Sequence, residues 1–102
     1  MDVSPLGPKE PTYHQEVKQS INLFEQSFQG MQQSQFNAQK DQYVKVMKES
    51  LSAIQDVANA TVNKHLSELK DQLSNDLDSY IAHPDDAHRR KVETDIREIK
   101  YS

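Results

Sequence analysis

The side chains best suited to chemistry in this sequence are its four histidines, His14, His65, His83 and His88. A zinc site on one helix needs ligands three or four residues apart, because only then do both side chains share a face. His83 and His88 are five residues apart, with Pro84 between them. Asp85 and His88 have the right spacing, but two ligands alone make a weak site. We therefore predict no metal site.

The other motifs that carry chemistry are also missing from the sequence. The chain has no cysteine for a thiolate site, and its two glycines are too few for a phosphate-binding loop. No Gly-x-Ser-x-Gly motif surrounds any serine, and the acidic residues alternate with basic ones rather than forming a catalytic pair. We therefore predict a protein that is not an enzyme, with no catalytic residues and no cofactor.

Composition limits the classes of partner. The chain has 102 residues and a net charge of -4, from 12 basic and 16 acidic side chains without a basic stripe for nucleic acid. No apolar run approaches the length of a membrane span, and the N-terminus lacks the pattern of a secretory signal. We expect a cytoplasmic protein, or one that a dedicated secretion system exports without a cleavable signal.

The longest regular pattern runs from residue 42 to residue 81. Its apolar residues recur every 3.6 positions or so, which is the period of an α-helix, and neither glycine nor proline interrupts them. They are Val44, Met47, Leu51, Ile54, Ala58, Val62, Leu66, Leu69, Leu73, Leu77 and Tyr80. The pattern predicts one central helix over about 41–82, roughly 60 Å long. His65 lies at the edge of this stripe, either as a boundary residue or as one that sets the register of a helix pair.

Two shorter helices flank the central one. Apolar residues at Val17, Ile21, Phe24, Phe28 and Met31 predict a helix over about 13–32, with Thr12 as its N-cap. A third helix over about 84–101 follows, because a proline ends the preceding helix and suits the first position of the next. Ion pairs such as Asp86–Arg90 and Glu93–Arg97 would support this highly charged helix.

The remaining segments are a proline-rich arm and a polar connection. Residues 1–12 hold three of the four prolines, which predicts a flexible arm or a short docking segment. Between residues 29 and 42 the apolar pattern stops, so we expect a turn near 32–40 with Asn37 or Asp41 as a cap. One unbroken helix from 13 to 82 is the alternative. Phe36 is the one aromatic residue in this connection.

These elements predict an all-α fold: a three-helix arrangement of residues 13–102, with a helical hairpin, one long central helix and coiled-coil-like packing. The first helix would fold back along the first half of the central helix, which leaves the second half with an apolar face. Only 34% of the residues are hydrophobic, too few to cover that face well within one chain. We therefore expect a protein partner or a second copy to cover it, in a homo-oligomer for example. The predicted partner interface is Val62, Leu66, Leu69, Leu73, Leu77, Tyr80 and Phe36.

The function that these patterns favour is protein–protein interaction or assembly, as in a small chaperone, an adaptor, or a subunit of a bacterial secretion apparatus or phage particle. In size and in its lack of cysteine and tryptophan, the chain resembles the small helical-hairpin proteins of secretion systems. Phe28-Gln29-Gly30 is similar to the Trp-x-Gly turn of WXG-type secreted hairpins, although phenylalanine replaces the tryptophan. Tyr80 also lacks an acidic residue four positions later. The alternative functions are therefore a WXG-type hairpin or a monomeric regulatory binding module.

Overall fold

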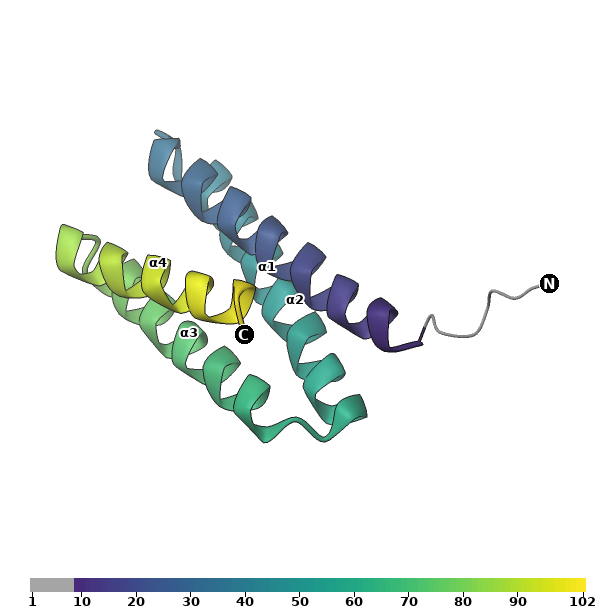
Figure 1. Cartoon of the computed structure of the whole chain (residues 1–102). Helices are drawn as coiled ribbons and strands as arrows, with labels where there is room; N and C mark the ends of the chain where they lie inside the picture. Colours follow the sequence, from purple (N-terminus) through teal and green to yellow (C-terminus); the bar gives the residue numbers. More distant parts are fainter. Residues whose placement is uncertain (1–8) are drawn as a thin grey trace.

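Residues 9–102 fold into four α-helices arranged as two antiparallel hairpins that cross one another. A computed structural model describes residues 9–102 (Figure 1). Its helices are α1 (Lys9–Gln33), α2 (Asn37–Thr61), α3 (Lys64–Ala82) and α4 (Asp86–Lys100). α1 packs mainly on α2 and α3 mainly on α4, while α2 contacts α3 and α1 contacts α4. The described residues contain no strand, so the all-α prediction is confirmed.

The prediction of one long central helix is wrong. The segment expected to be helical over 41–82 is divided into α2 and α3, which separate at Val62 and Asn63. The backbone N–H groups of these two residues donate to the carbonyl groups of Asn59 and Ala58, which closes the end of α2. Asn63 then caps α3, because its side-chain oxygen accepts a hydrogen bond of 3.0 Å from the backbone N–H of Leu66. The chain therefore turns back where the apolar spacing alone predicts continuation.

Several helix ends in the structure also differ from the predicted ones. α1 begins at Lys9, so Thr12 lies within it rather than at its N-cap, and residues 1–8 of the predicted arm lie outside the described residues. The expected turn between the first two helices is present, at residues 34–36, but the N-cap of α2 is Phe36 and neither Asn37 nor Asp41. Pro84 precedes α4, whose N-cap is Asp85.

The core lies along the α1–α2 hairpin and continues between α3 and α4. Phe24 and Phe28 of α1 are fully buried. They belong to one core cluster with buried residues of the other three helices, which are Met47, Leu51, Ile54, Val57, Ala58, Leu66, Leu69, Leu73, Leu77, Val92, Ile96 and Ile99. The apolar face of the predicted central helix is thus largely covered within the chain. Coiled-coil packing stays a prediction.

Gly30 lies inside α1 and not at the turn that a WXG-type hairpin would place there. A Cβ atom at this position would come within 2.6 Å of the Tyr43 ring on α2. Glycine therefore allows the aromatic ring to lie directly against the α1 backbone. This close approach explains why a residue with a low helix propensity is tolerated in the helix.

Two adjacent residues of α1 test this description of the core. We expect Phe24→Ala to lower the free energy of unfolding by about 3–5 kcal/mol, because it leaves a cavity in a fully buried site. The matched control is Leu23→Ala, since Leu23 is 47% exposed, and its effect should stay below about 1 kcal/mol. Urea unfolding followed by circular dichroism measures both. Equal losses for the two variants would contradict the placement of α1.

Candidate functional site

The structure separates the predicted partner interface into buried and exposed residues. Leu66, Leu69, Leu73 and Leu77 of α3 are buried within the chain itself. Tyr80 is partly buried, with its ring edge-on to the Phe28 ring at a centroid distance of 5.1 Å. In this arrangement of the helices the four leucines are not available to a partner. Whether they contact one after a rearrangement stays a prediction.

Val62 and Phe36 are the exposed members of the predicted interface. Their side chains are 81% and 65% exposed. Phe36 precedes α2 and Val62 follows it, so the two are separated by the whole helix of 25 residues, or about 37 Å. They therefore belong to different surfaces at opposite ends of the α1–α2 hairpin (Figure 1).

Val62 has a strained backbone as well as an exposed side chain. Its φ and ψ angles are 52° and 46°, in the left-handed region, and it is the one non-glycine residue with positive φ among those described. Helices commonly end in this conformation, but the residue is usually glycine or asparagine. For a residue with a Cβ atom the conformation costs about 1–2 kcal/mol, and a β-branched side chain is rare there. Valine is thus locally unfavourable at this position.

A groove of about 240 Å³ begins beside Val62, since both of its neighbours, Thr61 and Asn63, line it. All four helices contribute to its walls, and the apolar part consists of Tyr13, Val17, Val57, Leu66 and Ile99. Tyr101 adjoins the groove through Lys18, whose Nζ atom lies 5.9 Å from the centre of the tyrosine ring. We call Val62 and this groove the Val62 surface.

The opposite end of the hairpin has a second groove of about 240 Å³. Its apolar residues are Met31, Val44, Tyr80, Ile81 and Pro84. Phe36 is next to it in sequence, because Asn37 lines the groove. The Phe36 backbone is extended, with φ −108° and ψ 137°, and therefore unstrained. The two ends are similar in size and apolar character, but only the Val62 surface includes a strained residue.

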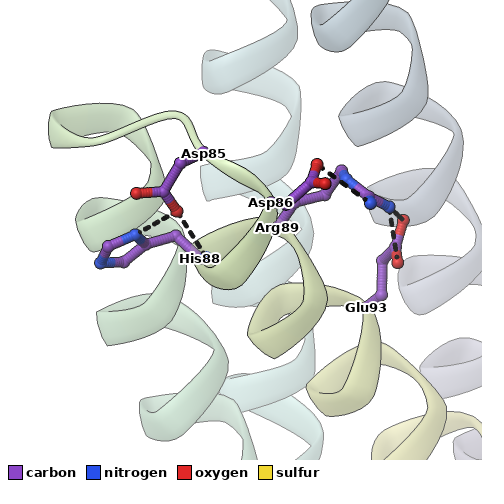
Figure 2. A network of polar contacts seen from close by, with 5 residues as sticks. All are labelled: Asp85, Asp86, His88, Arg89 and Glu93. Atoms are coloured by element: carbon purple, nitrogen blue, oxygen red, sulfur yellow. Dashed lines mark hydrogen bonds and ion pairs between the residues drawn. The ribbon is translucent and has the colours of Figure 1, made fainter.

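The pair considered as metal ligands, Asp85 and His88, has a structural role at the start of α4 (Figure 2). Asp85 Oδ1 accepts a hydrogen bond of 2.9 Å from the His88 backbone N–H and lies 2.6 Å from His88 Nδ1. These bonds, the backbone one first, lower the pKa of Asp85. Within residues 9–102 no group of three or more histidine, aspartate or glutamate side chains is placed to hold a metal ion.

Arg89 forms the ion pairs of α4, in place of the predicted Asp86–Arg90 and Glu93–Arg97 pairs. Its guanidinium group lies 3.3 Å from Asp86 and 3.0 Å from Glu93, so it joins two turns of the helix (Figure 2). These groups are on the surface of α4 and stabilise the helix itself.

A buried carboxyl group beside a partly exposed one, between α3 and α4, is the feature that the sequence analysis missed. Asp95 of α4 is only 3% exposed, and Asp76 of α3, which is partly exposed, lines the same pocket. The signal was present in the spacing, because Asp95 is three residues after Val92 and four before Ile99. It therefore lies on the buried face of its helix.

Comparisons with known proteins identify no relative: no family model matches the chain, nor does any curated protein or solved structure. Residues 9–102 also include no helix that is both long enough and apolar enough to cross a membrane. Any functional conclusion therefore depends on the geometry described above.

The strain at Val62 predicts an unusual result for a substitution by glycine. We expect Val62→Gly to raise the free energy of unfolding by about 1 kcal/mol, because relief of the left-handed strain exceeds the entropy cost of glycine. The melting temperature should rise by roughly 4–8 °C. The matched control is Val62→Ala, which keeps the Cβ atom and therefore most of the strain. Thermal melting followed by circular dichroism compares the two, and a glycine variant less stable than the alanine variant would argue against the strain.

Proposed function

We propose that this chain is a non-enzymatic assembly protein that binds a second copy of itself through the Val62 surface. The observation that carries the proposal is Val62, a β-branched apolar residue that is 81% exposed in a conformation that favours glycine. Inside the chain this side chain contributes little burial and adds strain. A contact made with another protein is a physical reason for valine at this position.

A second copy is the partner that the shape of this surface favours. The groove beside Val62 is bordered by its own neighbours, Thr61 and Asn63, and combines apolar walls with the polar side chains of His14, Lys18 and His65. Two such surfaces can meet about a two-fold axis, with each valine side chain in the groove of the other copy. A contact of this kind uses the same patch on both chains and closes at a dimer.

The Val62 surface also offers aromatic side chains for an interface. Tyr13 and Tyr101 are exposed at the same groove or adjoining it, and aromatic side chains of this kind contribute strongly to protein interfaces. Broader assembly, as in an adaptor or a subunit of a larger particle, would need a further surface. The groove near Phe36 has the size and apolar lining for that second contact.

The experiment is the molar mass from light scattering across a hundredfold dilution, measured for the full chain. We expect a dimer that dissociates on dilution, and we expect Val62→Asp to weaken it at least tenfold, because the carboxylate would lose its hydration against the apolar wall of the groove where the valine methyl groups packed. Circular dichroism on the same samples checks that the variant keeps its helices.

Phe36→Asp is the matched control, since it places the same charge at an exposed apolar residue at the other end of α2. It should leave the dimer unchanged. Loss of the dimer in Phe36→Asp alone would move the interface to the other groove. A helical monomer at every concentration would contradict self-assembly and favour a monomeric binding module.

A further inference from the structure

One acidic side chain, Asp95, is buried in the otherwise apolar contact between α3 and α4. On α4, Asp95 is buried beside Val92, Ile96 and Ile99, which are all fully or almost fully buried. Its Oδ2 atom has no hydrogen-bond partner among the described residues. Asp76 of α3, which is partly exposed, lines the same pocket. A charge on the buried Asp95 carboxyl group therefore carries a large penalty, which a second carboxylate nearby increases.

The charged groups around Asp95 do not remove this penalty. From α3 it faces Asp76, with Gln72 lining the same pocket. From its own helix it faces Glu98, which adds to the negative charge, and Lys91, which opposes it.

The other cations near Asp95 either form ion pairs elsewhere or lie at the edge of its pocket. Among the described residues, Arg90 lines the pocket without a salt bridge to either carboxyl group. On the side of α1, Glu25 is paired with Lys100 of α4 at 2.7 Å, so neither of these charges is directed at Asp95. Asp78 of α3 is likewise paired, with Lys48 of α2 at 2.7 Å. The buried Asp95 carboxyl group is therefore neutralised by a proton rather than by a salt bridge.

We propose that Asp95, buried beside Asp76, is a pH-sensitive latch, which holds α4 on α3 while its carboxyl group is protonated and loosens α4 when this group ionises. This inference concerns a contact within the chain, and it does not require the dimer proposed above. It has a consequence for partners, because α3 packs mainly on α4 and its Leu69, Leu73 and Leu77 are buried in the chain. Release of α4 would expose the stripe that the sequence predicts to be a partner interface.

The direction of the pH response follows from the titration of Asp95. Burial, the hydrogen bond to Asp76, and the negative charges of Asp76 and Glu98 raise the pKa of Asp95 from 3.8 to about 8. Between these values the docked helix holds a proton that the released helix does not. Docking is therefore strongest below about pH 4, weakens as the pH rises, and becomes independent of this group above about pH 8. One proton changes the docking equilibrium by up to about tenfold per pH unit.

Amide hydrogen exchange at pH 6 and pH 8 tests the latch, with the wild type compared at each pH with Asp95→Asn. Asparagine keeps the shape of the protonated acid and cannot ionise. Since both proteins are measured at the same pH, the chemical exchange rate cancels. We expect α4 amides of the wild type to lose between about 10-fold and 100-fold more protection than those of the variant from pH 6 to pH 8. Amides of the α1–α2 hairpin should change equally in both.

Asp78→Asn is the control, because it removes the same charge from an exposed site on α3. It should keep the pH response of the wild type. Asp76→Asn provides a second test if Asp95→Asn does not fold, and it should reduce the response because one of the two like charges is gone. Parallel changes in the wild type and in the asparagine variants, together with a carboxyl ¹³C resonance of Asp95 that titrates at its ordinary pKa, would overturn the proposal.

Discussion

The reversal of the chain between α2 and α3 is the constraint on which the rest of the structure depends. If residues 37–82 formed one straight helix, Leu66 to Leu77 would extend beyond the reach of α1 and stay uncovered. The left-handed backbone of Val62 and the side-chain cap of Asn63 end one helix and start the next within two residues. α3 then lies back across the hairpin, and α4 can cover it while it also touches α1. The capping bond stabilises the helix by about 1 kcal/mol, which is similar to the strain it accompanies. The small difference between the capping free energy and the strain at Val62 thus determines how the two hairpins cross.

Helical periodicity predicted which residues are buried better than where the helices end. Phe24, Leu51, Ile54 and Leu73 were all placed on apolar stripes, and each is buried. The break at Val62 escaped notice because Ala58, Val62 and Leu66 keep a spacing of four residues across it. Only the weak helix propensities of Asn59, Thr61, Val62 and Asn63 marked the site, and propensity is a small term beside tertiary contacts. The N-caps of α2 and α4, Phe36 and Asp85, were likewise not predicted, because they depend on the direction in which the chain enters each helix.

The candidate sites were less predictable, because they arise between elements. The groove beside Val62 draws residues from four helices, and no one segment indicates that Tyr13 and Ile99 will meet. The burial of Asp95 could be inferred from its place on the apolar face of α4. Its acidic neighbour could not, because Asp76 comes from a different helix and reaches Asp95 only when α3 and α4 pack. The exposure of Val62 could not be predicted, because Val62 shares the periodicity of an apolar stripe and yet lies outside the core.

Val62 and Asp95 are the two positions where the local chemistry contradicts the environment. One is an apolar β-branched residue, exposed where glycine is preferred, and the other is a carboxyl group buried where a leucine would be more stable. Each costs the chain stability that a single substitution could restore, and a sequence selected for folding alone has no reason to keep either. They also act on different parts of the molecule, since Val62 lies at the joint between the hairpins and Asp95 lies inside the second one. A contact between copies at the joint and a loosening of α4 would therefore be separate events. The leucine stripe of α3 extends to both places, because Leu66 lines the groove while Leu73 is buried in the core that α3 shares with α4.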